Sequence, residues 1–284
     1  MPKIAFSADW HFRGKDLDAA TCQLAEMIAI CRDRGISAHC VAGDIFDKGN
    51  IFDSTASTGK IAGAVIGLIA NEPFQWIFIP GDHDYPGAGQ ADALSTINQF
   101  GIVTRDIGTA LSLFYYGVRI YTLPWSWLYN RNAMISLLTC LNGPDAPREV
   151  NEKRVLIGHC QVFGALLNAK KNCEADPASM QSEAPRGKDR WTFTREEIAS
   201  LGFDHIALGD FHRRQDLFDG KGGYVGALRQ LNFGEEGNHA GFEIWDSETG
   251  ETEWIELNAA PRYRTVEVAE GEKIPEAGPN EFLK

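Results

Sequence analysis

Aspartate and histidine residues recur in this sequence at the points where apolar runs end. Five such runs close with glycine or alanine, followed directly by a carboxylate or an imidazole. The five residues that follow are Asp9, Asp44, Asp82, His159 and Asp210. Because a small residue permits a sharp turn and a close approach to the backbone, this repeated ending is typical of a ligand site built from several strand ends.

Three further histidines stand beside these strand ends. His11 and His212 each follow an aspartate by two residues, and His83 follows one directly. If the segments stay extended, residues two apart point to the same side of the chain. We therefore expect four carboxylates and four histidines to converge in one crevice.

A crevice with this many acidic groups requires cations, because four neighbouring carboxylates would repel one another and could not all stay ionised. Oxygen and imidazole ligands without thiolate suit manganese, magnesium or iron better than structural zinc. Eight candidate ligands suit two ions that share a carboxylate at a separation of roughly 3.5–4 Å. A single aspartate after glycine is usually a turn or cap residue, so the prediction depends on all five endings occurring together.

The elements that must position these residues alternate in the first hundred residues. Strand patterns at 3–7, 39–42 and 76–80 are separated by helix patterns at 18–35, 54–70 and about 90–100. This alternation predicts a sheet of parallel strands with crossover helices.

Later in the chain the pattern changes to pairs of strands, at 111–117 with 118–125, at 222–228, and as a hairpin over 241–257. We expect the two ends of the chain to build two sheets packed face to face, with helices outside. The polar stretch 168–190 is expected to be a long surface loop, or a flap over the site.

The composition is that of an ordinary folded protein, with 284 residues, 44% of them hydrophobic and 23% charged. The six cysteines form no CxxC pair, which indicates free, mostly buried thiols in a reducing compartment. Neither a signal-peptide pattern nor a run long enough to cross a bilayer is found, so we expect a cytoplasmic protein without membrane contact. The net charge of −12 argues against autonomous nucleic-acid binding, but not against a nucleic-acid enzyme that uses metal ions and a partner.

Five segments resemble, in order, the motifs of the calcineurin-like metallophosphoesterases. They are SADWHFRG (7–14), VAGDIFDKGN (41–50), IPGDHDYPG (79–87), LIGHCQVFG (156–164) and LGDFHRRQ (208–215). Within that superfamily, GGYVGALRQLNFGEEGNHAGFEIWD (222–246) resembles the SbcD family of DNA double-strand-break repair nucleases. The resemblance implies a four-layer α/β/β/α sandwich, with residues 1–258 as the nuclease domain and 259–284 as a tail, the remnant or start of a capping domain.

The resemblance also implies a role for each residue of the crevice. The first ion would be held by Asp9, His11, Asp44 and His212. The second ion would be held by Asp44, which bridges both ions, and by Asp82, His159 and Asp210. His83 would protonate the leaving oxygen, and Asp84 would hold its ring.

Two features depart from the family pattern. Asp82 stands where the family has Asn and Asp210 where it has His, so each adds a negative charge to the second ion's site. SbcD-type nucleases also continue into a DNA-capping domain and a partner-binding segment, whereas 26 residues (284 minus 258) follow Asn258 here. We therefore expect the cap, the docking segment or both to be missing, reduced or supplied elsewhere.

The resulting hypothesis is a two-metal phosphodiesterase acting on DNA, with manganese, or else magnesium or iron, as its ions. The expected partners are DNA, an SbcC-type ATPase subunit and a second copy of the chain. A phosphatase or phosphodiesterase for a nucleotide or another small phosphoester is an alternative, since one fold hosts many substrates. A non-catalytic subunit that keeps the fold for binding is another, against which the presence of the motif residues speaks.

Overall fold

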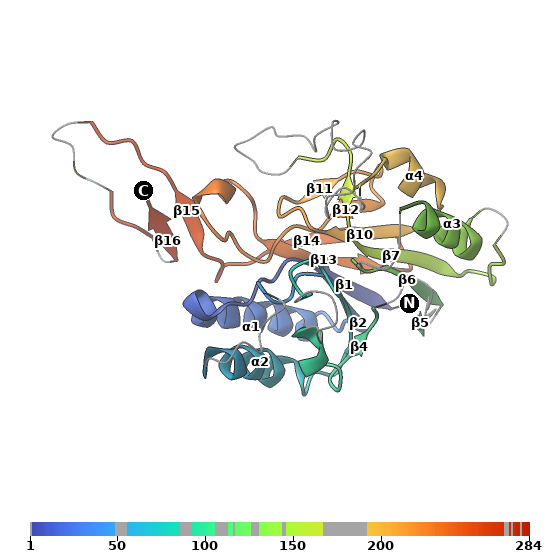
Figure 1. Ribbon diagram of the computed structural model, residues 1–284, viewed down its shortest axis with the longest axis horizontal. Helices are drawn as coiled ribbons and strands as arrows, with labels where there is room; N and C mark the ends of the chain where they lie inside the picture. The colour runs from blue at the N-terminus through green and yellow to red at the C-terminus, as the bar shows by residue number, and fades with distance from the viewer. Residues whose placement is uncertain are drawn as a thin grey trace.

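Two six-stranded sheets pack face to face, and helices cover their outer faces, in a computed structural model of the protein (Figure 1). The predicted four-layer α/β/β/α sandwich is confirmed. The structure describes residues 2–48, 56–85, 93–105, 113–115, 117–125, 131–143, 146–166, 192–269, 273, 275–278 and 280–284. The predicted loop at 168–190 lies outside this part of the chain.

The first sheet has the strand order β14-β13-β1-β2-β3-β4. Its strands are β1 (Lys3–Ser7), β2 (Ala38–Ala42), β3 (Gln75–Ile79), β4 (Ile102–Val103), β13 (Gly241–Asp246) and β14 (Thr252–Glu256). Strands β1 to β4 run parallel, as predicted, and β13 and β14 form the predicted hairpin. The hairpin joins β1 in antiparallel pairing, so the expectation that the two ends of the chain build separate sheets is wrong. The strand pattern alone did not indicate which sheet edge the hairpin would join.

The second sheet has the order β11-β12-β10-β7-β6-β5. Its strands are β5 (Leu113–Tyr115), β6 (Val118–Leu123), β7 (Lys153–His159), β10 (His205–Gly209), β11 (Gln215–Asp216) and β12 (Gly222–Tyr224). The core of this sheet, from β6 through β7 and β10 to β12, is parallel. Both sheets therefore present carboxyl ends of parallel strands, where ligands bind in α/β folds.

Two pairs of helices cover the sandwich on opposite sides (Figure 1). They are α1 (Leu17–Asp33) with α2 (Ala56–Ile69), and α3 (Arg131–Asn142) with α4 (Arg195–Ser200). The sequence reading missed α3 and α4, although a capping box of Thr194 and Glu197 marks the start of α4. The helix predicted at about 90–100 is wrong in its described part: only the 3₁₀ turn η2 (Ala93–Thr96) forms, and i to i−3 hydrogen bonds continue to Phe100.

Alternating side chains along each strand build three apolar layers. On β1, Ile4 and Phe6 enter the core between the sheets, whereas Ala5 faces the helices. On β7, Ile157 enters the same central core and Leu156 packs toward α3 and α4. This two-residue period fixes both sheets in register, and hence the positions of their strand ends.

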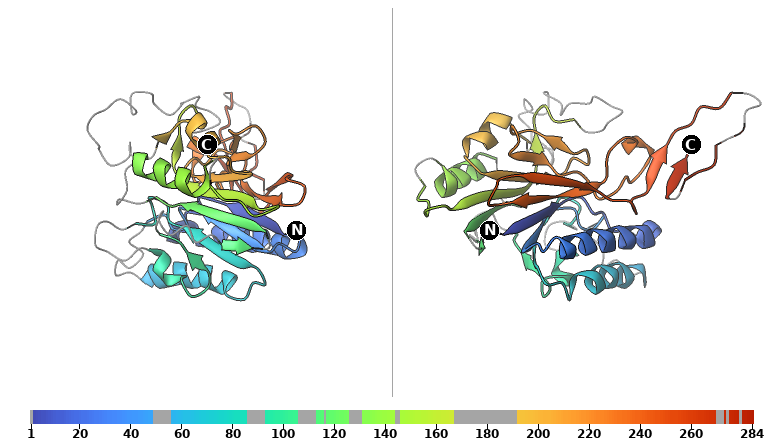
Figure 2. Two further views of the ribbon diagram at one scale, coloured as in Figure 1. Left: turned by 90° about the vertical axis from the view of Figure 1, so that its right-hand side faces the viewer. Right: turned by 180° about the vertical axis from the view of Figure 1, so that it is seen from behind.

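Beyond residue 258, a short parallel ladder of β15 (Arg262–Arg264) and β16 (Glu281–Leu283) projects from the body of the molecule (Figure 2). The division into a domain of residues 1–258 and a tail stays a prediction. The short elements β8 (Gln161–Val162), β9 (Thr192–Phe193), η1 (Gly14–Asp16) and η5 (Phe233–Glu235) complete the fold.

The described cysteines are free, and Cys31, Cys40 and Cys160 are buried as expected, but Cys22 and Cys140 are exposed. Cys173 lies outside the described residues. Within the part of the chain that the structure covers, no helix has the length and apolar character needed to span a membrane.

Candidate metal centre

Strand ends from both sheets meet at one site, which is called the crevice below. The segments after β1, β2 and β3 belong to the first sheet, and the ends of β7 and β10 belong to the second. Two hydrogen bonds join them directly: His159 Nδ1 lies 2.8 Å from the Ala42 carbonyl oxygen, and the Asp210 N–H donates to Asp9 Oδ1 at 3.1 Å. The five predicted strand-end residues therefore converge.

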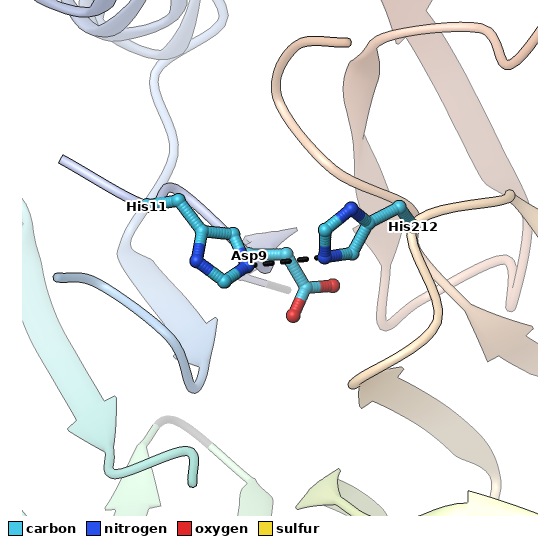
Figure 3. A group of neighbouring side chains, drawn as sticks. All are labelled: Asp9, His11 and His212. Carbon is cyan, nitrogen blue, oxygen red and sulfur yellow. Dashed lines mark hydrogen bonds between the residues drawn. The ribbon is translucent and has the colours of Figure 1, made fainter. Parts of the chain in front are cut away.

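The side chains form two triads of potential ligands. The first triad is Asp9, His11 and His212 (Figure 3), and the second triad is Asp82, His159 and Asp210. Within each triad the ligand atoms lie within 4.8 Å of one another. Asp44 connects them, because it groups with Asp9 and His159 as well as with Asp82 and His83. The structure thus brings all seven predicted ligands together; their binding of metal stays a prediction.

In the first triad, two imidazoles face each other. The Nε2 atoms of His11 and His212 lie 3.0 Å apart (Figure 3), and His11 Nε2 lies 3.5 Å from Asp44 Oδ2. Burial and the neighbouring His212 keep the pKa of His11 well below its usual value. Burial alone would also lower the pKa of His212, but its hydrogen bond with Glu235 and the nearby Asp9 outweigh burial and raise it to about 9. Without metal, a proton on His212 therefore lies where the two rings converge.

In the second triad, carboxylates surround one imidazole. His159 Nε2 lies 3.5 Å from Asp82 Oδ1, 3.6 Å from Asp44 Oδ1 and 3.9 Å from Asp210 Oδ1. Burial alone would lower the pKa of His159, but these carboxylates, led by Asp44, raise it well above its usual value. Since Nδ1 is held by a carbonyl oxygen, Nε2 is the atom left to bind a cation.

The crevice contains buried polar atoms that a bound cation would satisfy. Asp9 Oδ2, His159 Nε2 and Asp210 Oδ2 have no hydrogen-bond partner among the described residues. Burial raises the pKa of Asp9 to about 7 and that of Asp210 to about 6. A buried polar atom without a partner is costly. Because the potential ligand atoms are carboxylate oxygens and imidazole nitrogens, this set fits divalent ions such as Mn²⁺, Mg²⁺ or Fe²⁺.

The ligand-bearing segments turn sharply. Asp9, His11, Asp44 and Asp210 have positive φ angles of 52°, 44°, 53° and 97°. The expectation that these segments stay extended is therefore wrong; left-handed turns bring Asp9 and His11 to the same site while Trp10 between them is fully buried. Such conformations are uncommon for residues other than glycine and concentrate at functional sites.

Glycines before the ligands leave room for close approach. A Cβ atom at Gly81 would lie 2.0 Å from Asp44 Oδ1, and one at Gly209 would lie 2.0 Å from the Ala42 carbonyl oxygen. At Gly43, a Cβ atom would lie 2.3 Å from His159 Nδ1. The small residues of the sequence pattern are thus required by the packing of one strand end against another.

His83 lies exposed beside the crevice. Its Nδ1 is 2.8 Å from the Asp47 carbonyl oxygen, and its backbone N–H donates to Asp44 Oδ1 at 3.0 Å. The His83 and His11 rings meet edge to face, with centroids 4.8 Å apart. The ring is thus fixed next to Asp44, which connects the two triads.

The predicted role of Asp84 is wrong, because its carboxylate does not hold the His83 ring. Asp84 is fully buried and accepts the N–H groups of Gly81 at 2.9 Å and Phe46 at 3.0 Å. Burial, together with the nearby Asp44, raises its pKa to about 7. Asp84 therefore braces the segments after β2 and β3, and the Asp47 carbonyl orients His83.

Sequence reasoning missed two residues at the site. Asp47 orients His83 through its main-chain oxygen, a contact with no residue-type signal, and its carboxylate forms a further group of potential ligands with His11 and His83. Glu235 lies 2.9 Å from His212 Nδ1 through Oε1, but it is 23 residues further along the chain and lies in a 3₁₀ turn. No spacing rule connects them; only the general tendency of metal-binding histidines to pair with a carboxylate would have prompted the search.

The sequence matches the family model for calcineurin-like phosphoesterases over residues 2–214, so the chain belongs to the calcineurin-like phosphoesterase family. Membership implies metal-dependent hydrolysis of a phosphoester, and the acidic and histidine clusters agree with it. No curated protein sequence matches the chain.

Solved structures resemble the chain at low identity. One is TT1561 of Thermus thermophilus, with 10% identity and a TM-score of 0.46, covering 90% of this chain and 98% of that one. Another is GAP50, the anchor in the inner membrane complex of Plasmodium, with 10% identity and a TM-score of 0.45, covering 96% of this chain and 99% of that one.

Proposed function

We propose that the protein is a two-metal-dependent phosphodiesterase that acts on DNA, an SbcD-like nuclease of repair or recombination. The observation that carries the proposal is the pair of triads connected by Asp44, which offers two adjacent cation sites with one shared carboxylate. The resemblance of residues 222–246 to the SbcD family supports DNA as the substrate.

The triads supply the ligands for both ions. The first ion would be held by Asp9, His11, Asp44 and His212, and the second by Asp44, Asp82, His159 and Asp210. When bound, divalent ions supply Lewis-acid polarisation of the phosphoryl group and a nucleophile at neutral pH. The eight ligand positions include the shared Asp44, so neither ion needs a ligand from outside the crevice.

His83 is the proton donor in this proposal. With Nδ1 held by the Asp47 carbonyl, Nε2 is the atom that can give a proton to the leaving oxygen. Partial burial alone would lower the pKa of His83, but the negative charge of Asp44 and the hydrogen bond to Asp47 outweigh burial and raise it. In the metal-free protein these contacts therefore favour the imidazolium form, which carries the proton to be donated.

A small phosphoester is the second candidate substrate, and the net charge of −12 favours it, since an acidic surface binds the DNA backbone weakly. For the nuclease, the acidic surface is the reason to propose an SbcC-type ATPase, or a second copy of the chain, as the partner that holds DNA against the crevice.

Hydrolysis by the purified, Mn²⁺-loaded chain tests the proposal on single-stranded DNA, duplex DNA, a nucleotide diester and a mononucleotide ester. We expect cleavage of DNA that stops on chelation and is stimulated when an ATPase partner, recovered from native extracts, is added. Fast hydrolysis of the mononucleotide ester without cleavage of DNA would establish the small-molecule enzyme. Loss of activity on all four substrates with both ions bound would support the non-catalytic alternative.

A further inference from the structure

We infer that Glu235 is a positioning residue that fixes the ring of His212 in the first triad. This inference rests on the ligand role proposed for His212. Glu235 Oε1 lies 2.9 Å from His212 Nδ1, and the residue is only 6% exposed. Of the residues around the crevice, Glu235 belongs to no potential ligand group within the described part of the chain.

The contact determines which ring nitrogen of His212 faces the cation site. When Nδ1–H donates to the carboxylate, Nε2 is directed toward His11 Nε2, 3.0 Å away (Figure 3). A carboxylate at the far nitrogen fixes the tautomer and the ring orientation of a metal-binding histidine and increases its basicity. Glu235 thus prepares His212 to bind before any ion arrives.

The carboxylate of Glu235 is itself held on both oxygens. The Leu231 N–H donates to Oε2 at 2.8 Å, and Asn232 Nδ2 donates to Oε1 at 3.4 Å. The Asn232 side chain also caps the turn η5, because its Oδ1 accepts the Gly234 N–H at 2.7 Å. Rotation of the Glu235 carboxylate would break these bonds, so its direction is determined by the loop.

The loop that carries Glu235 is anchored at three points, two of them on β15 and one on Thr265, the residue directly after it. The Phe233 and Tyr263 rings meet edge to face with centroids 4.9 Å apart, and Gln230 Oε1 accepts the Tyr263 N–H at 2.7 Å. Glu236 Oε2 accepts the Thr265 hydroxyl at 2.7 Å. Removal of one anchor leaves two, so the neighbouring Glu236 offers a matched control in the same turn.

Titration of Mn²⁺ into the metal-free protein, by calorimetry and by electron paramagnetic resonance, tests the inference. In Glu235→Ala we expect one of two ions to bind about 10- to 100-fold more weakly while the other is unchanged. The spin-coupled signal of two neighbouring Mn²⁺ ions should appear only at a correspondingly higher Mn²⁺ concentration. Glu235→Gln, whose amide oxygen still accepts a hydrogen bond, should recover part of the affinity, and Glu236→Ala should remain within about twofold of the wild type.

The outcomes separate this inference from the proposed function. Two ions in the wild type with unchanged affinities in Glu235→Ala would overturn the positioning role and leave the two-metal proposal intact. No ion in the wild type would overturn the proposed function itself. If Glu235→Ala does not fold, Glu235→Asp is the variant to measure. Its shorter side chain should weaken the binding of one Mn²⁺ ion, and unchanged affinities would overturn the inference.

Discussion

The two triads of the metal centre differ in charge. The first triad contains two imidazoles and one carboxylate, whereas the second contains one imidazole and two carboxylates. Asp82 and Asp210, which the resemblance implies stand in place of the family's Asn and His, both lie in the second triad. In the proposed function, the first triad would suit a borderline metal and the more anionic second triad a hard cation, so we expect the two ions to differ in affinity.

The triads also differ in how their histidines are held. His159 of the second triad contacts the Ala42 main-chain oxygen, whereas His212 of the first triad contacts the Glu235 side chain. A main-chain contact persists through any substitution that keeps the fold, but a side-chain contact can be changed by one substitution. The first triad is thus the half of the centre whose geometry can be tuned separately from the sheet.

His83 belongs to neither triad in the proposed function, so its removal should separate chemistry from metal binding. We expect His83→Ala to lower the hydrolysis rate about 10²- to 10⁴-fold, the usual contribution of a general acid, at unchanged metal content. Rates and elemental analysis of the same preparation provide the check. His239→Ala, which removes an exposed histidine elsewhere, is the control. Loss of an ion in His83→Ala would assign His83 to a triad.

The pairing of His212 with Glu235 should stabilise the metal-free protein in acidic and neutral solution. This stabilisation should be lost in alkaline solution. The folded-state pKa of His212, about 9, lies above the ordinary value of 6.5, so this stabilisation is complete below pH 6.5 and is lost as pH rises through about 9. Since one pKa unit corresponds to about 1.4 kcal/mol, the difference of about 2.5 units (9 minus 6.5) corresponds to a contribution of about 3 to 4 kcal/mol.

Urea denaturation of chelator-treated protein at pH 6, 7.5 and 9 measures this loss. The slope of the free energy of unfolding against pH should be smaller in Glu235→Gln, because a neutral amide stabilises the proton on His212 less than a carboxylate does. Glu196→Gln removes the same charge from an exposed position on α4 and should keep the wild-type slope. Equal slopes in all three proteins would show that the first triad does not contribute to this pH dependence.

The extra charge of the second triad should affect the pH dependence of catalysis. Four ionised aspartates balance two divalent cations, whereas Asn at position 82 would leave the centre net positive. A more positive centre favours a nucleophile at lower pH, so Asp82→Asn should move the rising limb of the pH–rate curve down by about half a unit. Profiles at saturating Mn²⁺ test this. If the rising limbs of the wild type and Asp82→Asn coincide at full Mn²⁺ occupancy, a proton shared between carboxylates already neutralises the extra negative charge.

The sequence predicted the convergence of the five strand-end residues because parallel strands that belong to packed sheets end at a common edge. His11 and His212 also reach the site, although the extended segments on which their prediction depended do not form. The sequence also predicted a close approach of the backbone at the small residues before the strand-end residues, which the contact of Gly81 with Asp44 confirms. It was wrong about Asp84, because adjacency in the chain does not determine contact when the backbone turns. The Asp47 carbonyl has no residue-type signal at all.

Long-range placement accounts for the other differences. Glu235 is brought to His212 by the loop between β12 and β13, and nothing in its local sequence encodes that contact. The hairpin of β13 and β14 was recognised from its turn, but its antiparallel pairing with β1 is a contact between opposite ends of the chain, which a local pattern does not encode. The local pattern of apolar residues predicts where helices and strands form. It does not predict which strands pair with one another.

Metal content of Asp44→Ala tests the central claim, that one carboxylate connects two cation sites, most directly. After loading with Mn²⁺ and removal of free metal, we expect two ions per chain in the wild type and in the control Asp18→Ala, which changes an exposed aspartate on α1. Asp44→Ala should retain fewer than one ion, because both proposed metal sites lose the carboxylate that they share and the His83 N–H loses its acceptor. Two ions per chain in Asp44→Ala would contradict the account.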